Sequence, residues 1–221
     1  MDTPFRTHSP LDKFLSVIDQ GLRSSLASTG KTITARRPMP TPQIASPVAD
    51  LSPSDRALSA RLMRVNHAGE VAAQALYQGQ ALVALEPATR EFMLQSAREE
   101  ADHLAWCTKR LADLGAEPSR LNPLWYLGSF TIGATVGLVG RRFSLGFVKE
   151  TEVQVEGHLN DHLTRLPAED TASRAVLLQM REDENRHGMN AVERGASDLP
   201  EPVRALMRLT AKVMTLSAER I

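Results

Sequence analysis

The sequence predicts an all-α protein built around a bundle of four long helices. Apolar residues recur every three or four positions through four long segments, which is the spacing of an amphipathic helix. Proline and glycine interrupt this pattern and leave only short connections between the segments. Aromatic residues make up 5% of the chain and do not alternate with polar ones as strands require. These observations argue against a β-rich fold.

The first part of the chain, residues 1–51, is predicted to be an arm that precedes a helical domain spanning 52–221. Within the arm, residues 11–26 carry apolar side chains at helical spacing and predict a short amphipathic helix. The prolines that follow, from Pro38 to Pro53, forbid a continuous helix. We expect this Pro-rich arm to be wrapped on the surface of the domain or disordered.

The helical domain begins where Ser52 is followed by Pro53, since serine caps a helix and proline fits its first turn. Breaks are expected at Pro87, Gly115 and Pro167, and the resulting connections have lengths normal for helical bundles. A further amphipathic helix is expected at the C-terminus. The predicted helices cover residues 52–85, 88–114, 146–166, 171–194 and 201–221.

An insert without charged side chains, residues 122–140, separates the second and third helices of the bundle. Its four glycines and single proline make it weakly apolar for a membrane span, and a span would place those two helices on opposite sides of the bilayer. The alternatives are a helical hairpin lying in the membrane surface and a segment buried in the protein. We favour a membrane-associating insert, with Trp125, Phe130 and Ile132 as its lipid contacts.

Overall composition excludes some classes of function. Lys and Arg together number 26, as do Asp and Glu, so no net positive field attracts nucleic acid, and no nucleic-acid partner is expected. Cys107 is the only cysteine, which excludes an intrachain disulfide and a cysteine-based zinc site.

Two Glu-x-x-His motifs carry the first indication of chemistry. Glu100 and His103 lie three residues apart on the second helix, and Glu184 and His187 repeat this spacing on the fourth. Side chains three apart on a helix share a face, and in both cases that face is otherwise apolar. A buried carboxylate must be paired, protonated or bound to a metal ion.

The first and third helices each add one carboxylate to an apolar face, namely Glu70 and Glu152. Glu70 precedes Glu100 by 30 residues and Glu152 precedes Glu184 by 32, which indicates an internal duplication of a helix pair. One glutamate from each of two helices and Glu-x-x-His from the other two is the pattern of di-iron carboxylate bundles.

This pattern predicts two iron ions per chain. Glu100 and Glu184 are expected to bridge them, and these two glutamates with Glu70 and Glu152 are the candidate catalytic residues. Oxygen and nitrogen ligands suit iron or manganese and disfavour a structural zinc site. The six predicted metal ligands are Glu70, Glu100, His103, Glu152, Glu184 and His187.

Residues beside the ligands are candidates for orienting the imidazoles, as metal-bound histidines usually require. Asn66, His67 and Asp102 could serve here, or could equally be surface or capping residues. His158 lies near Glu152 on its helix, and we weigh a position at the mouth of the site against a surface position.

Several of these motifs together resemble the demethoxyubiquinone hydroxylases, a ferritin-like family of ubiquinone biosynthesis. The resemblance covers about residues 61–221 and places the family's iron ligands on the same six residues. It matches His158 to a histidine near the substrate, although Leu159 replaces the tyrosine that follows it in animal members. The residues that carry the resemblance are 64–70 (RVNHAGE), 100–103, 131–140, 150–152 and 182–187.

The resemblance implies a monooxygenase that uses dioxygen to hydroxylate the ring of a polyprenylated methyl-methoxy-benzoquinol. Because such a substrate is insoluble in water, it implies a peripheral protein on a membrane surface that docks through residues 122–148. In a bacterium this surface is the cytoplasmic face of the cell membrane, and in a eukaryote it is the mitochondrial inner membrane. A homo-oligomer or a biosynthetic complex is left open, since Gly133 and Gly137 permit helix packing within or between chains.

Three other functions are alternatives to quinol hydroxylation. An iron-storage protein of the ferritin type would share all six ligands but would have no use for the Gly-rich insert. A desaturase or a radical-generating reductase subunit is usually longer, and the latter needs a tyrosine near the metals, for which Tyr77 is the candidate. A purely structural bundle would leave four carboxylates in the core unexplained.

Overall fold

The computed structural model describes residues 35–42 and 51–221, and this part of the chain is helical with no strand. The all-α prediction is therefore confirmed for the described residues. The predicted helix at 11–26 lies outside them. The helices are α2 (Pro53–Val83), α3 (Pro87–Asp113), α4 (Asn122–Val139), α5 (Arg141–Arg165), α6 (Thr171–Glu193) and α7 (Glu201–Ala218).

Local capping explains where the bundle helices begin. The Ser52 hydroxyl accepts a hydrogen bond from the Asp55 backbone N–H, and Pro53 occupies the first turn of α2. At α6, the Asp170 carboxylate accepts the Ser173 N–H at 2.9 Å. Both starts agree with the sequence prediction.

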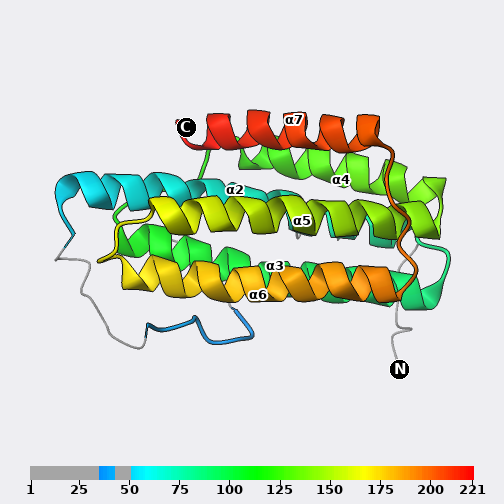
Figure 1. Ribbon diagram of the computed structural model, residues 1–221, viewed down its shortest axis with the longest axis horizontal. Coiled ribbons are helices and arrows are strands. Elements are labelled where there is room, and N and C mark those ends of the chain that lie inside the picture. Colours follow the sequence, from blue (N-terminus) through cyan, green and yellow to red (C-terminus); the bar gives the residue numbers. More distant parts are fainter. Residues whose placement is uncertain (1–34, 43–50) are drawn as a thin grey trace, which may run out of the picture.

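The arrangement of the helices is a bundle with an added outer layer (Figure 1). Helices α2 and α3 form one hairpin and α5 and α6 form the other, with α2 beside α5 and α3 beside α6. Helices α4 and α7 lie on the outer side of α2 and α5. The four helices that carry the predicted ligands therefore surround a common core.

Two of the apolar clusters that make up the core lie at different heights along the bundle. One includes Met63, Leu111 and Met180, and the other includes Tyr77 and Val148. On each of the four helices, the candidate metal ligands lie between the residues that enter the two clusters. Apolar side chains consequently seal the ligand layer from both ends.

The uncharged insert is one helix, α4, and one of its faces is packed tightly on α2. A Cβ atom added to Gly133 would lie 2.2 Å from the Leu76 carbonyl oxygen, and one added to Gly79 would lie 2.2 Å from that of Phe130. Only glycine allows so close an approach of two backbones. Gly133 and Gly137 of this segment thus pack within the chain.

This packing corrects the expectation for the insert. Phe130 is buried against α2 and is not available to lipid, and Trp125 is half-buried beside Val65. Ile132 is exposed as expected. The other exposed apolar side chains of α4 are Leu124, Leu127, Leu138 and Val139. In the described part of the chain, no helix has both the length and the apolar character needed to cross a bilayer.

Helix α5 begins five residues before the predicted start. Gly140 has a φ of 130°, which only glycine adopts readily, so the chain turns there and becomes helical at once. Gly146, taken as a boundary in the sequence, lies within α5. A Cβ atom there would meet the Ser197 carbonyl oxygen at 2.2 Å, so this glycine serves packing instead of ending a helix.

Candidate metal centre

All six predicted ligands meet in the centre of the bundle, and all six are buried. Their nitrogen and oxygen atoms form two overlapping groups, and the candidate ligand atoms within each group lie within 4.8 Å of one another. Glu100 and Glu184 belong to both groups. The first group is Glu70, Glu100, His103 and Glu184, and the second is Glu100, Glu152, Glu184 and His187.

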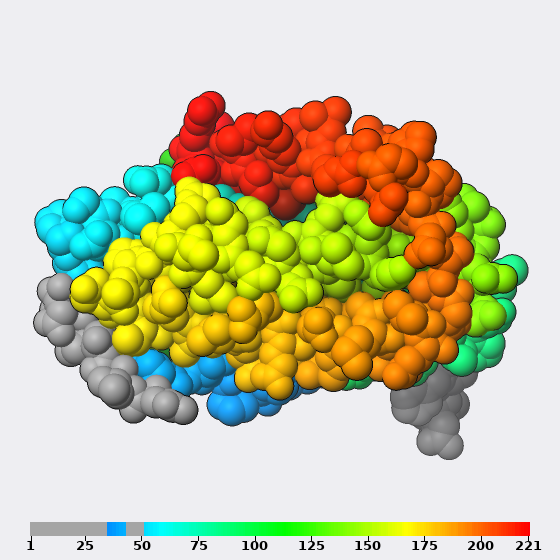
Figure 2. Space-filling view, viewed as in Figure 1, coloured from blue at the N-terminus to red at the C-terminus, as the bar shows by residue number. Residues whose placement is uncertain are grey.

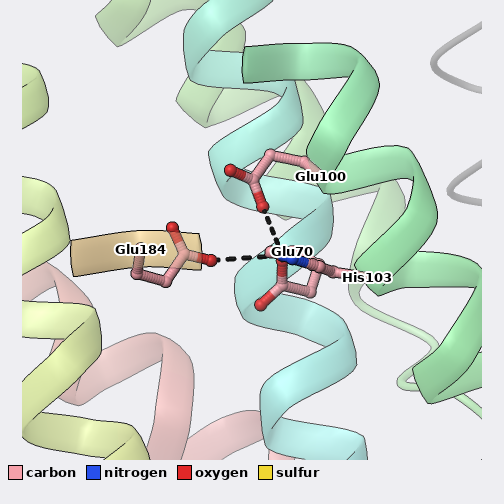
Figure 3. A group of neighbouring side chains, drawn as sticks. All are labelled: Glu70, Glu100, His103 and Glu184. Atoms are coloured by element: carbon pink, nitrogen blue, oxygen red, sulfur yellow. Dashed lines mark hydrogen bonds and ion pairs between the residues drawn. The ribbon is translucent and has the colours of Figure 1, made fainter. Parts of the chain in front are cut away.

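The side chains of the first group come from three helices, α2, α3 and α6, and point toward one another (Figure 3). Nδ1 of His103 lies 3.2 Å from Glu70, 3.1 Å from Glu100 and 3.2 Å from Glu184. In the second group, Nδ1 of His187 lies 3.3 Å from Glu100 and 3.2 Å from Glu184. Both imidazoles therefore present Nδ1 to the carboxylates.

The outer nitrogen of each imidazole faces a carboxylate from the other helix. Nε2 of His103 lies 2.9 Å from Asp183 on α6, and Nε2 of His187 lies 2.9 Å from Glu99 on α3. A carboxylate at this position accepts the Nε2 proton and leaves the Nδ1 lone pair free for a metal ion. The two halves of the site thus repeat one arrangement across the bundle.

Glu99 and Asp183 were missed in the sequence, although a pattern marks them. Each directly precedes a predicted bridging glutamate, so both motifs are an acidic residue followed by Glu-x-x-His. Arg186 links the two, lying 2.9 Å from Glu99 and 2.8 Å from Asp183. Tyr77 is a further buried partner, since its hydroxyl donates to Oε1 of Glu152.

The candidates suggested for orienting the imidazoles are placed differently. Asn66 accepts a hydrogen bond from His162, and His67 bonds Thr108 and Asn122. Neither has a bond to a ligand imidazole among the described contacts. Asp102 bonds the backbone N–H of Arg36 and the side chain of Arg37, both in the arm. All three side chains are buried, but their hydrogen bonds go to residues other than the two ligand imidazoles.

The His158 ring lies against the His162 ring at a tilt of 57°, with ring centroids 3.9 Å apart. Its Nε2 is buried and has no hydrogen-bond partner in the described structure. No described hydrogen bond or ion pair joins it to the six ligands. A role near the substrate stays a prediction.

Electrostatics sets this cluster apart from an ordinary core. Burial lowers the pKa of His103, but hydrogen bonds to Asp183 and the glutamates outweigh burial and raise that pKa well above its usual value. Burial and neighbouring carboxylates raise the pKa of Glu70 and of Glu152. Protons and metal cations therefore compete for the same buried atoms.

The donor atoms fit metal binding. Oε1 of Glu100 and Oε1 of Glu184 are buried without a well-formed hydrogen bond, and they lie 3.3 Å from Nδ1 of His187 and 3.2 Å from Nδ1 of His103, the atoms with which they would share a metal ion. Four carboxylates and two neutral imidazoles balance the charge of two divalent cations. This oxygen-rich set without sulfur suits iron or manganese.

The surroundings of the two histidines differ. A cavity of about 370 Å³ reaches the outer edge of His187 and is lined by Glu91, Phe92, Gln95 and Glu99 among others. The outer edge of His103 is covered by Arg37 of the arm, whose Nη2 lies 3.3 Å from Nε2. One half of the site is thus open toward the surface and the other is covered.

Comparison with known proteins agrees with this geometry. Residues 57–218 match the family model described as Ubiquinone biosynthesis protein COQ7. The 3-demethoxyubiquinol 3-hydroxylase of Ralstonia pickettii (strain 12J) is 52% identical over 220 residues, which cover 96% of this chain and all of the relative.

Two further proteins of the same name have similar sequence identities and coverages. That of Variovorax paradoxus (strain S110) is 51% identical, covering 96% of this chain and 99% of its own length. That of Paraburkholderia phytofirmans (strain DSM 17436 / LMG 22146 / PsJN) is 53% identical, with 94% and 98% covered. The likeness extends beyond residues 61–221 into the N-terminal arm, for which the sequence alone offered no match. The chain belongs to the COQ7 family of ubiquinone biosynthesis proteins.

Proposed function

We propose that this chain is a di-iron 3-demethoxyubiquinol 3-hydroxylase, which inserts one oxygen atom of dioxygen into the ring of a polyprenylated benzoquinol. The observation that carries the proposal is the pair of buried ligand groups that share Glu100 and Glu184. It is supported by relatives about 50% identical along nearly the whole chain that bear this name.

Iron, when bound, supplies the reaction with dioxygen that amino-acid side chains cannot perform. Glu100 and Glu184, which belong to both ligand groups, would be the residues shared by the two ions. Asp183 and Glu99 fix the Nε2 protons of the two histidines, so that Nδ1 of each faces the site. Tyr77 donates to Oε1 of Glu152 and leaves Oε2 for a metal ion.

The balanced reaction shows how many electrons and protons must reach the site. The ring C–H becomes C–OH, the second oxygen atom leaves as water, and two electrons and two protons are consumed. The two apolar clusters close the ligand layer at both ends of the bundle, so that water can approach it mainly from the side of the His187 cavity.

Iron content per chain after expression with iron tests the metal centre. We expect close to two ions for the parent and nearly none for Glu184→Ala. Glu182→Ala is the matched control, because Glu182 is an exposed carboxylate two residues away on the same helix. Equal iron in all three proteins would contradict the ligand assignment, and far more than two ions would indicate storage.

Hydroxylation tests the substrate class. The iron-loaded parent with a chemical reductant and ¹⁸O₂ should convert a short-chain demethoxyquinol to a product heavier by one labelled oxygen atom. Glu184→Ala should give none, while Glu182→Ala should match the parent. An iron-loaded parent that leaves the quinol unchanged would refute the hydroxylase proposal while leaving the metal centre intact.

We also propose that the protein docks on a membrane surface through α4 and α7. Besides the exposed apolar residues of α4, α7 exposes a stripe of apolar side chains at helical spacing. Helix α7 forms the upper ridge of the molecule, in orange and red (Figure 2). An amphipathic helix of this kind suits the interface of a bilayer, where a polyprenylated substrate resides. The stripe consists of Leu206, Leu209, Val213 and Leu216.

Sedimentation with vesicles of phosphatidylcholine and phosphatidylglycerol tests this docking. Leu209→Ser/Val213→Ser should bind several-fold less than the parent. Leu178→Ser/Met189→Ser is the control, because these side chains are exposed to a similar degree on α6, away from the proposed surface. If all three proteins sediment equally, the docking proposal is wrong.

A further inference from the structure

The arm between residues 35 and 42 lies against α3 and α6, where it appears in blue along the edge of the bundle (Figures 1 and 2). Arg36 and Arg37 make its polar contacts with α3. The Arg36 backbone N–H donates to Asp102 at 2.6 Å, and Nε of Arg37 donates to the same carboxylate at 3.1 Å. The Trp106 indole N–H donates to the Arg37 carbonyl at 3.3 Å, and the guanidinium lies 4.8 Å from the centre of the Trp106 ring.

Arg37 also reaches the hydrogen bond behind a predicted metal ligand. Its Nη1 lies 2.7 Å from Oδ2 of Asp183, and this same oxygen lies 2.9 Å from Nε2 of His103. A guanidinium presents several donors in a rigid plane, so it can hold two carboxylates at once. Arg37 therefore fixes Asp102 and Asp183 relative to each other, with His103 behind them.

The two halves of the site differ in where their arginine comes from: Arg186 of α6 contacts Glu99 and Oδ1 of Asp183, whereas Asp102 and Oδ2 of Asp183 are joined by Arg37 of the arm. On α6 the residue before His187 is Arg186, whose guanidinium contacts the carboxylate behind that histidine, Glu99. On α3 the residue before His103 is Asp102. This half of the site therefore has an acidic residue at the position where the other half has the basic residue Arg186. Arg37 places its guanidinium between Asp102 and Asp183 and completes the pattern from outside the bundle.

We propose that Arg37 is a positioning residue for the metal centre, acting through Asp183 to hold His103 with Nδ1 toward the metal. The inference rests on the proposed metal centre and deepens it. Without Arg37, Asp102 and Asp183 face each other near His103 without the cation that joins them. Asp183 is then drawn toward Arg186, and the imidazole of His103 loses its fixed orientation.

Iron release into a strong chelator such as ferrozine tests the proposal independently of activity. The parent, loaded anaerobically with two ferrous ions per chain, is compared with Arg37→Ala and Arg36→Ala. Loss of the partner directly behind a metal-bound histidine typically weakens metal binding about 10–100-fold, so Arg37→Ala, which acts through that partner, should release one of its two ions faster by a factor of up to about 10. The other ion, held beside His187, should leave at the parent rate.

Arg36→Ala is the matched control, because it removes the same charge from the neighbouring residue but keeps the backbone N–H that bonds Asp102. Arg36→Ala should release both ions at the parent rate. Arg37→Lys, which keeps the charge but reaches fewer acceptors, should fall between the parent and Arg37→Ala. Equal release from the parent and Arg37→Ala, or equal acceleration in Arg36→Ala and Arg37→Ala, would overturn the proposal.

A spectroscopic measurement separates positioning from a general loosening of the fold. In the zinc-loaded protein with ¹⁵N-labelled histidine, His103 should show the Nε2–H form in the parent and a changed signal in Arg37→Ala. Thermal unfolding of the metal-free proteins should show Arg37→Ala still cooperatively folded, although it melts below Arg36→Ala because it loses ion pairs to two buried carboxylates. An unchanged His103 signal would refute the role of Arg37, whereas a parent that binds no metal would refute the proposed metal centre itself.

Discussion

Glu70 and Glu152 join different metal-ligand groups, and each shares its group with the same two carboxylates, Glu100 and Glu184. Glu70 lies beside His103 and Glu152 belongs with His187. The arrangement predicts that the four glutamates differ in how many ions their loss removes. Glu70→Ala and Glu152→Ala should each retain about one iron ion per chain, whereas Glu100→Ala should retain almost none.

Iron content, measured together with unfolding of the metal-free variants, checks this prediction. Glu150→Ala, on α5 beside the site but outside both ligand groups, is the control and should bind as much iron as the parent. The idea of two sites sharing two glutamates fails if Glu70→Ala loses both ions while Glu100→Ala keeps one.

The convergence of the six candidate ligands was predictable because the motifs are local features of single helices. Glu100 and His103 share a face by spacing alone, and four such apolar faces in a bundle must meet. The outer partners were not predictable in the same way, since Asp183 serves a histidine on a different helix. Arg37 is further still from any motif, because an irregular arm carries no periodicity from which its docking site could be derived.

The limits of the fold prediction have a similar cause. Glycine ends helices when the chain needs a positive φ, as at Gly140, but it also permits close helix contacts, as at Gly133 and Gly146. The sequence alone does not separate the two uses. The start of α5 was therefore misplaced, and the burial of Phe130 against α2 was missed.

The contact between α2 and α4 should be sensitive to a single methyl group at Gly133. Its Cβ would lie 2.2 Å from the backbone oxygen of Leu76, so the two helices must separate. Overpacking of this kind typically costs about 1–3 kcal/mol. We expect Gly133→Ala to lower Tm by roughly 2–12 °C, since about 1 kcal/mol shifts Tm by about 2–4 °C in a chain of this size.

Gly128→Ala is the control for this change. Gly128 lies on the same helix, but nothing lies within 4 Å of the added Cβ atom. Alanine is a better helix former by about 1 kcal/mol, so Gly128→Ala should leave Tm unchanged or raise it slightly. A Gly133→Ala protein that melts with the parent would show that α4 is not held on α2 by this close contact.

A buried ion pair joins the end of α3 to the start of α6. Nη2 of Arg110 donates to Oδ1 of Asp170 at 2.7 Å, and Nε donates to the Ser173 hydroxyl at 2.8 Å. Both charged side chains are almost fully buried. Because Arg110→Met leaves a buried carboxylate without its cation, we expect it to lower the free energy of unfolding by about 3–5 kcal/mol in urea titrations.

The double variant Arg110→Met/Asp170→Asn tests the reason for that loss. Asparagine also caps helices, so the second change removes the charge while keeping the cap at α6. The double variant should be more stable than Arg110→Met alone. If Asp170→Asn lowers the free energy of unfolding as much in the Arg110→Met background as in the parent, the two side chains are not coupled. The loss in Arg110→Met would then not come from an unpaired Asp170 carboxylate.

His67 gives the protein a defined dependence of stability on pH. Burial lowers the pKa of His67 to about 4 in the folded state, against an ordinary value of 6.5. Its ring nitrogens bond the Thr108 hydroxyl and the Asn122 amide, as a neutral imidazole can. The unfolded chain therefore binds more protons than the folded chain between pH 4 and pH 6.5.

Because the unfolded chain binds more protons, the free energy of unfolding falls as pH is lowered. The contribution of His67 to that free energy is fully present above pH 6.5, declines between pH 6.5 and pH 4, and changes little below pH 4. The difference between those limits is about 3 kcal/mol for a single buried imidazole. His67→Gln removes the titrating group while keeping polar atoms near Thr108. In urea titrations of the metal-free proteins, the stability of the parent relative to His67→Gln should fall by that amount between pH 7 and pH 4. A constant difference across this range would mean that the His67 imidazole keeps its ordinary pKa in the folded protein.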